Sequence, residues 1–156
     1  MAGTSVLFVC LGNICRSPLA EAAFRHAAQA AELDIEVDSA GTGSWHIGNP
    51  PDPRAQAEAL RHGIDISSYR ARQVNHDDFD RFDFIFALDE RNLADLKAGS
   101  ADGHRAQVAL LLDVVPGLAG KSVADPYFGD AAGFELTWLE VSLAADALVT
   151  RLRNGS

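Results

Sequence analysis

Residues 6–18 run VLFVCLGNICRSP, an apolar segment that leads into a short loop and then into the start of a helix. The apolar segment is too short for a helix and rich in β-branched side chains, which predicts a strand buried on both faces. Ser17 and Pro18 predict the N-cap and the first position of the helix. The loop between these elements opens with Cys10 and closes with Arg16, so a thiol and a guanidinium lie at the two ends of one small backbone ring.

Strand-like and helix-like segments alternate along the rest of the chain. This alternation predicts an α/β fold, a single-domain three-layer sandwich whose central parallel, four-stranded sheet carries helices on both faces. We expect one domain over residues 1–156, because a chain of this length supports a single continuous core. In parallel sheets ligands bind at the carboxyl ends of the strands, and the first strand ends at Cys10. The further strands are expected at 35–40, 83–88 and 107–112, and the helices at 20–31, 52–62, 75–82, 89–97 and 134–153. In the last helix the apolar spacing predicts core positions at Phe134, Trp138, Leu139, Val141, Leu143, Leu148 and Leu152.

The composition is that of an acidic globular protein. Lysine and arginine number 13, aspartate and glutamate number 22, the formal net charge is −9, and 47% of the residues are hydrophobic. An acidic surface disfavours nucleic acid and anionic membranes as partners, and any bound anion then requires a locally positive site. The first residues lack the pattern of a signal peptide, and no apolar run approaches the roughly 18 residues of a membrane span. We therefore expect a cytoplasmic monomer without nucleic-acid or membrane partners.

The loop between the first strand and the first helix has the residue types that a phosphate requires. A helix N-terminus leaves backbone N–H groups unpaired and partly positive, and a loop curled over it adds further N–H groups. Gly12 and Asn13 tolerate the backbone angles of such a curl, and Arg16 offers a planar fork of donors that matches two phosphate oxygens. The same positive field favours the thiolate of Cys10, the nucleophilic form. The Ser17 hydroxyl is placed to hydrogen-bond that sulfur.

Cys10 and Arg16 alone do not establish catalysis. A cysteine six residues before an arginine is common by chance, and a cysteine at the end of a buried strand is usually inert. The preceding strand, the Gly-Asn pair inside the loop and the Arg-Ser-Pro helix start occur together with this pair, and their combination favours a nucleophilic, phosphate-binding loop.

These motifs resemble the signature of the low-molecular-weight protein tyrosine phosphatases, and the resemblance covers nearly the whole chain as a single phosphatase domain. It implies that Cys10 forms a phosphocysteine intermediate, that Arg16 and the loop amides bind the phosphate, and that no cofactor is needed. It also implies that the substrates are phosphotyrosine-containing proteins and aryl phosphate monoesters. The matching segments are VCLGNICRSP at 9–18, DSAGT at 38–42, ARQ at 71–73, LDERNL at 88–93 and DPYF at 125–128. The phosphate-binding residues implied within the loop are Leu11, Gly12, Asn13, Ile14, Cys15 and Ser17.

Asp125 is the candidate proton donor to the leaving group. Expulsion of a tyrosine oxygen as a bare anion is unfavourable, so a proton donor is needed beside it. From the residues alone the favoured interpretation is a turn aspartate, because Asp-Pro is a frequent turn dipeptide. The resemblance assigns Asp125 instead as the general acid, and later as the base that activates water on the phosphocysteine.

Trp45 and Tyr127 are the candidate walls of a slot for a phenyl ring. Both lie in loops that are expected to converge at the strand ends, and a slot of that depth selects phosphotyrosine over the shorter phosphoserine. From the sequence alone Trp45 is equally well explained as a core anchor for its own loop. His46, Asn49 and Asp52 are candidates for further contacts at the rim.

Several residues are candidate supports of the loop. Asn13 and Ser39 match family positions that hold the loop by hydrogen bonds. Asp89 is a further candidate, although capping of the next helix would explain it completely. Tyr69 stands where many relatives carry a histidine, and Phe128 stands where relatives often carry a second tyrosine.

Cys15 is the other cysteine of the loop. The resemblance favours a redox role, in which Cys15 captures oxidised Cys10 as a disulfide and prevents irreversible oxidation; the alternative is a small buried side chain. No cysteine follows Cys15, which weighs against a thioredoxin-coupled arsenate reductase, since that chemistry needs further cysteines. The loop alone also fits a non-catalytic phosphate-binding module, and the presence of Asp125 with Cys10 and Arg16 disfavours it. None of the five histidines has a histidine or cysteine at ligand spacing, so we expect no metal.

Overall fold

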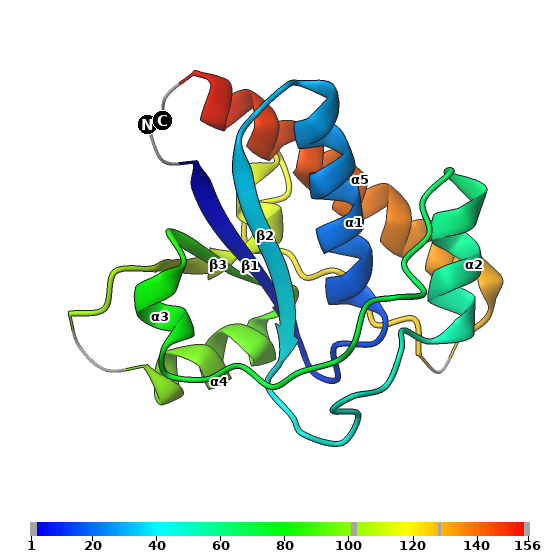
Figure 1. Cartoon of the computed structure of the whole chain (residues 1–156), viewed down its shortest axis with the longest axis horizontal. Coiled ribbons are helices and arrows are strands. Elements are labelled where there is room, and N and C mark those ends of the chain that lie inside the picture. The colour runs from blue at the N-terminus through cyan, green and yellow to red at the C-terminus, as the bar shows by residue number, and fades with distance from the viewer. Residues whose placement is uncertain (1–2, 101–102, 128, 155–156) are drawn as a thin grey trace.

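A four-stranded parallel sheet forms the centre of the computed structural model, which describes residues 3–100, 103–127 and 129–154. The strands are β1 (Thr4–Cys10), β2 (Ile35–Gly41), β3 (Phe84–Ala87) and β4 (Gln107–Leu110). The helices are α1 (Arg16–Ala30), α2 (Pro53–Arg61), α3 (Asp78–Arg81), α4 (Glu90–Gly99) and α5 (Ala131–Arg153), and a 3-10 turn covers Leu111–Val114. The strand order is β2-β1-β3-β4, so β1 lies inside the sheet (Figure 1).

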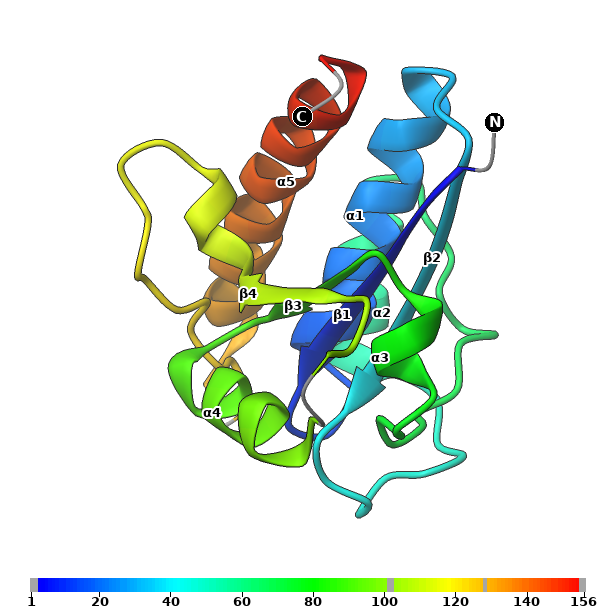
Figure 2. The same ribbon diagram turned by 90° about the vertical axis from the view of Figure 1, so that its left-hand side faces the viewer.

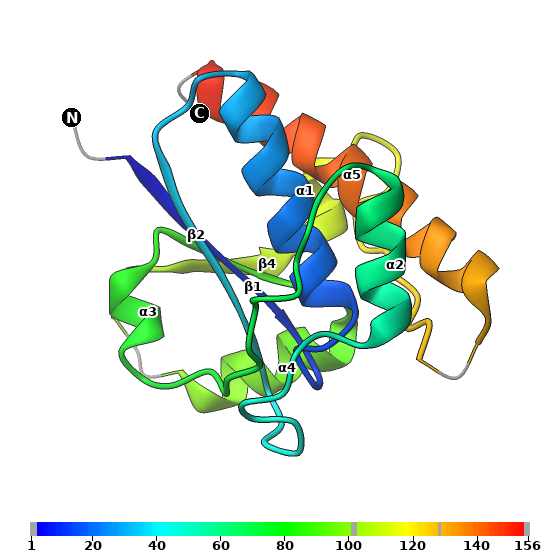
Figure 3. The ribbon, with the colours of Figure 1, turned by 45° about the vertical axis from the view of Figure 1, so that its right-hand side comes forward.

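The side chains of β1 enter two separate cores. Val6 and Phe8 pack with the helices α1, α2 and α5, whereas Leu7 and Val9 pack with α3 and α4. Successive side chains of a strand point to opposite faces, so an uninterrupted apolar run requires cover on both. Figures 2 and 3 show this cover, with α1, α2 and α5 on one side of the sheet and α3 and α4 on the other. The predicted three-layer α/β sandwich is confirmed.

The predicted N-cap of α1 is wrong. The cap position is Cys15, and α1 already begins at Arg16. Ser17 therefore lies within the first turn of the helix. Its hydroxyl contacts the side chains of Cys10 and Asn13 instead of the helix N–H groups.

Two of the predicted core positions in α5 are also wrong. Leu139 and Leu143 are 55% and 45% exposed. Other residues of the helix, some of them small, form its buried face at i, i+3, i+4 spacing. The two leucines lie outside this face. The buried positions are Phe134, Thr137, Val141, Ala144, Ala145, Leu148 and Val149.

The end signals of α2 agree with the sequence, whereas α3 and α5 start at other residues than predicted. Asp52 caps α2 by accepting a hydrogen bond from the backbone N–H of Arg54, and Gly63 takes a positive φ of 79° just beyond the helix. The helix α3 is shorter than predicted and starts after Asp77 rather than Asn75. The helix α5 starts three residues before Phe134, because Asp130 caps it.

Candidate active site

The segment 10–17, here called the phosphate loop, leaves the carboxyl end of β1 and enters α1 (Figure 1). Asn13 takes a left-handed backbone conformation with a φ of 59°, as the sequence predicted for a curled loop. The loop lies directly against the end of β2, where a Cβ on Gly41 would come within 2.7 Å of the carbonyl oxygen of Leu11. A glycine at this position therefore permits the close approach of the two backbones.

A chain of hydrogen bonds runs from the Cys10 sulfur into the protein. Cys10 Sγ lies 3.0 Å from Ser17 Oγ, and Asn13 Nδ2 donates to Ser17 Oγ at 2.8 Å and to Ser39 Oγ at 3.0 Å. Ser39 Oγ in turn donates to Glu21 Oε1 at 2.7 Å. Because Ser17 Oγ accepts from Asn13, its own hydrogen is left to donate to a Cys10 thiolate. The structure brings together Asn13, Ser17 and Ser39 as predicted.

Glu21 is a member of this network that the sequence analysis did not identify. It is buried, and burial raises the pKa of its carboxyl group, against the lowering effect of its hydrogen bonds with Ser39 and Arg25. The available signal was a charged residue on an otherwise apolar and alanine-rich helix face. Such a residue needs partners when it is buried.

Arg16 is buried and fixed from two sides. Its Nη1 donates to Asp89 Oδ2 at 2.7 Å and to the carbonyl oxygen of Val123 at 3.1 Å, and its Nη2 lies 3.6 Å from Asp125 Oδ2. Burial lowers the pKa of Arg16, but the negative groups of Cys10, Asp89 and Asp125 outweigh burial and raise it above the usual value. The guanidinium is therefore a permanent cation next to the sulfur.

Asp89 combines the two roles that its sequence position left open. Its Oδ1 accepts a hydrogen bond from the backbone N–H of Asn92 at 2.7 Å, so it caps α4. Its Oδ2 holds Arg16. One carboxylate thus serves both the helix end and the cation of the loop.

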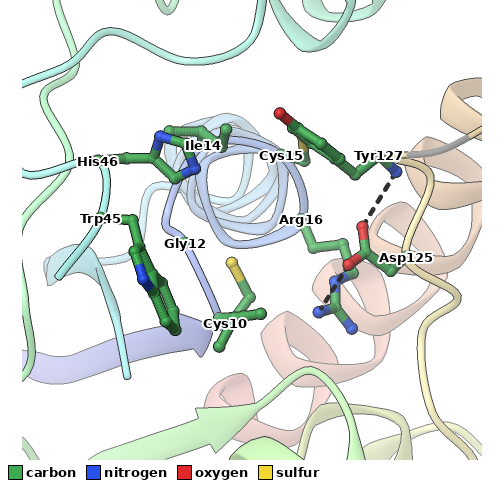
Figure 4. A pocket seen from close by; sticks show the side chains of 10 residues that line it. Cys10, Gly12, Ile14, Cys15, Arg16, Trp45, His46, Asp125 and Tyr127 are labelled. Carbon is green, nitrogen blue, oxygen red and sulfur yellow. Dashed lines mark hydrogen bonds and ion pairs between the residues drawn. The ribbon is translucent and has the colours of Figure 1, made fainter. Parts of the chain in front are cut away.

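A cavity of about 190 Å³ opens above the phosphate loop. Figure 4 shows the Cys10 side chain in it, with Trp45 on one side and Arg16, Asp125 and Tyr127 on the other. The lining residues are Cys10, Leu11, Gly12, Ile14, Cys15, Arg16, Trp45, His46, Asp125 and Tyr127.

The two predicted walls lie in this lining. Trp45 is 71% exposed, which excludes the alternative that it anchors its loop in the core, and Tyr127 is 38% exposed. His46 also lines the cavity and packs over Gly12, where an added Cβ would come within 2.9 Å of its ring. Asn49, a predicted rim residue, is not among the lining residues.

Asp125 makes the turn contact that its sequence position predicts, and it also borders the cavity. Its Oδ1 accepts a hydrogen bond from the backbone N–H of Tyr127 at 3.0 Å, which is the turn contact, and its Oδ2 points toward Arg16 (Figure 4). The side chain is only partly buried and borders the cavity. The turn therefore aims the carboxyl group into the candidate site.

Cys15 belongs to the phosphate loop and lines the cavity, whereas Tyr69 lies outside the loop. Both Cys10 and Cys15 are free and buried, and burial raises the pKa of the Cys15 thiol far above its usual value. Tyr69 is half-buried and interacts with Arg25, the partner of Glu21. Phe128, the other departure from the family pattern, lies outside the described residues.

The described residues hold no group of three or more histidine, cysteine, aspartate or glutamate side chains that could bind a metal ion. Among them, too, no helix combines the length and apolarity that a crossing of the bilayer requires.

The fold and the loop geometry define an α/β protein in which a loop with a buried cysteine and a buried arginine connects the first strand to the first helix. The family model described as low molecular weight phosphotyrosine protein phosphatase matches residues 5–155. A low molecular weight phosphotyrosine protein phosphatase of Schizosaccharomyces pombe is 46% identical over 83% of this chain and 84% of its own length. The low molecular weight protein-tyrosine-phosphatase YfkJ of Bacillus subtilis is 47% identical over 80% of this chain and 81% of its own. A crystal structure of YfkJ covers 100% of this chain and 98% of its own, with a TM-score of 0.92 at 39% identity. The chain therefore belongs to the low molecular weight phosphotyrosine protein phosphatase family.

Proposed function

We propose that the protein hydrolyses phosphotyrosine in proteins, and aryl phosphate monoesters, through a phosphocysteine intermediate on Cys10. Membership of the family supports the substrate class. The observation that supports the mechanism is the convergence of Cys10, Arg16 and Asp125 on one cavity between two aromatic side chains. The cytoplasmic monomer expected from the sequence is part of the same proposal.

In the first step the Cys10 thiolate attacks the phosphorus atom and the bond between phosphorus and the aryl oxygen breaks. Protonated Asp125 gives its proton to the leaving oxygen, so the phenol departs neutral. Arg16 and the backbone N–H groups of the phosphate loop bind the three other phosphate oxygens. The Ser17 hydroxyl stabilises the sulfur anion, because Asn13 already occupies the acceptor side of that hydroxyl.

In the second step water attacks the phosphorus atom of phosphocysteine. The Asp125 carboxylate takes a proton from this water, and the bond between sulfur and phosphorus breaks. Inorganic phosphate leaves, Cys10 returns as the thiolate and Asp125 is again protonated. The position of Asp125 at the cavity wall suits both transfers, since the leaving oxygen and the incoming water occupy the same side of the phosphorus.

Hydrolysis of p-nitrophenyl phosphate and of a phosphotyrosine peptide by three proteins tests this proposal. The wild type should turn over both substrates, Cys10→Ser should turn over neither, and Asp125→Asn should lose about 10²-fold or more in kcat with the phosphotyrosine peptide. The control is a phosphoserine peptide of otherwise the same sequence, which should be a poor substrate if the slot between Trp45 and Tyr127 selects phosphotyrosine. A wild type that binds phosphotyrosine without turnover would instead identify a binding module.

We propose in addition that Cys10 and Cys15 protect the enzyme from peroxide. The Cys10 thiolate attacks hydrogen peroxide, the O–O bond breaks, and a sulfenic acid forms with release of hydroxide. The Cys15 thiol then attacks this sulfur, and the disulfide forms while one water leaves. Both cysteines are free and lie in the same loop. Mass spectrometry after mild peroxide should find the intraloop disulfide in the wild type and irreversibly oxidised Cys10 in Cys15→Ser. Equal over-oxidation of both proteins would contradict this role.

A further inference from the structure

We infer that Arg54 is a positioning residue that ties the loop carrying Asp125 to the phosphate loop. Here the acid loop means residues 123–127 and 129–130. The inference rests on the proposed function, because it concerns how Asp125 is placed for its proton transfer. Arg54 lies on α2, and the sequence analysis assigned it no such role.

The guanidinium of Arg54 contacts the part of the acid loop that follows Asp125. Its Nη2 donates to the carbonyl oxygen of Tyr127 at 2.9 Å, and its Nη1 donates to the carbonyl oxygen of Gly129 at 3.1 Å. The guanidinium carbon also lies 5.7 Å from the centre of the Tyr127 ring and 4.8 Å from that of Phe134. One side chain therefore holds two backbone carbonyls and two aromatic faces.

The other end of this connection reaches the phosphate loop through Asp52. Arg54 Nε and Nη2 donate to the two carboxylate oxygens of Asp52 at 3.1 and 3.0 Å. The backbone N–H of Asp52 donates to the carbonyl oxygen of Ile14, inside the phosphate loop, at 2.8 Å. Asp52, which the sequence suggested as a rim residue, thus links the two loops instead.

Further anchors of the acid loop precede Asp125. The backbone N–H of Val123 donates to the carbonyl oxygen of Leu88 at 2.8 Å, and the Thr137 hydroxyl donates to the carbonyl oxygen of Ala124 at 3.4 Å. After Asp125, the Arg54 contacts fix the acid loop relative to α2 and, through Asp52, relative to the phosphate loop. A general acid must lie within hydrogen-bond reach of the leaving oxygen, and small displacements reduce the rate strongly.

Two alternative roles fit Arg54 less well. All three guanidinium nitrogens already donate to Asp52, Tyr127 or Gly129, so the group is not a vacant site for an acidic peptide. The side chain is 40% exposed, and an ion pair as exposed as that of Arg54 with Asp52 contributes little to stability, so a purely structural role is also a weak explanation.

The test compares Arg54→Gln with the wild type on two substrates that differ in leaving group. For phenyl phosphate, whose leaving oxygen needs a proton, kcat/KM should fall about tenfold. For 2,4-dinitrophenyl phosphate, whose leaving oxygen is stable as an anion, it should fall less than about twofold. Inhibition by vanadate should stay unchanged, because the phosphate loop is intact. The matched control is Arg61→Gln, which removes an arginine of the same helix that pairs with Glu58 and should change neither substrate.

A second comparison places Arg54→Gln in the Asp125→Asn background. If Arg54 acts through Asp125, the double variant should be no slower with phenyl phosphate than Asp125→Asn alone. An equal loss on both substrates, or an additive loss in the double variant, would overturn the inference and leave the proposed function intact. A wild type without turnover of either ester would instead refute the proposed function itself.

Discussion

Replacement of Asp89 by asparagine and by alanine separates the two contacts of its carboxylate. Asparagine keeps an oxygen for the backbone N–H of Asn92, and asparagine and aspartate are about equally good caps. It presents an NH₂ group to Arg16 where the wild type has an anionic oxygen at 2.7 Å. Alanine removes both contacts. Both variants therefore lose the ion pair with Arg16, and only Asp89→Ala also loses the cap of α4.

The expected magnitudes follow from the burial of Arg16. A hydrogen bond to a charged group contributes about 1.5–3 kcal/mol, and the Arg16 guanidinium would lose its carboxylate partner while staying buried. Asp89→Asn should therefore lower the free energy of unfolding by about 2 kcal/mol. Loss of the cap should add about 1 kcal/mol in Asp89→Ala. A misplaced Arg16 that costs about 2 kcal/mol in the transition state would lower kcat/KM about thirtyfold, equally in both variants.

Urea unfolding and hydrolysis of p-nitrophenyl phosphate measure the two effects independently. Wild-type kcat/KM in both variants would show that Arg16 keeps its place without Asp89, and the reasoning about the ion pair would fail. Equal unfolding free energies in the two variants would show that the cap contact contributes nothing. The two losses are separable because the cap does not touch Arg16.

Three further predictions concern the backbone, the thiols and the pH dependence. Gly41→Ala should weaken inhibition by vanadate about tenfold or more. The new Cβ would lie 2.7 Å from the Leu11 carbonyl oxygen and would displace the phosphate loop. Unchanged inhibition would refute this prediction. Iodoacetate near neutral pH should modify Cys10 in the wild type and no cysteine in Cys10→Ser. Cys15 should stay unmodified in both proteins, because burial raises the pKa of its thiol. A modified Cys15 in the variant, detected by mass spectrometry, would contradict this prediction. Burial raises the pKa of Glu21 above its ordinary 4.5, so its contribution to stability is present below that value and is lost as the pH rises through the raised pKa. Urea unfolding at a series of pH values between 4.5 and the raised pKa measures this effect. As the pH rises through this range, the free energy of unfolding should fall less in Glu21→Gln than in the wild type, and an equal fall would contradict the raised pKa of Glu21.

Local features of the sequence were enough to predict the architecture. The apolar run of β1 and the signals that bound α2, Asp52 and Gly63, depend on residues close in the chain, and the structure has these elements in place. The exposure of Leu139 and Leu143 could not be predicted in this way. Apolar spacing predicts burial for every leucine of α5, whereas actual burial depends on which face of the helix meets α1 and α2.

The parts of the candidate site that escaped prediction depend on contacts between distant segments. Glu21 becomes a member of the loop network because β2 brings Ser39 beside it. The link from Arg54 to Tyr127 spans 73 positions of sequence. No periodicity or cap signal encodes such a contact. The fold alone determines which side chains meet.

The exposure of Trp45 gives the protein a distinct thermodynamic signature. Its indole is largely hydrated in the free protein, and an aryl group that enters beside it removes apolar surface from water. Removal of such surface carries a negative heat-capacity change. Inorganic phosphate, which the proposed site binds at the loop alone, should leave the indole hydrated. Calorimetry over a range of temperatures thus distinguishes recognition of the ring from recognition of the anion, although both are bound in one cavity.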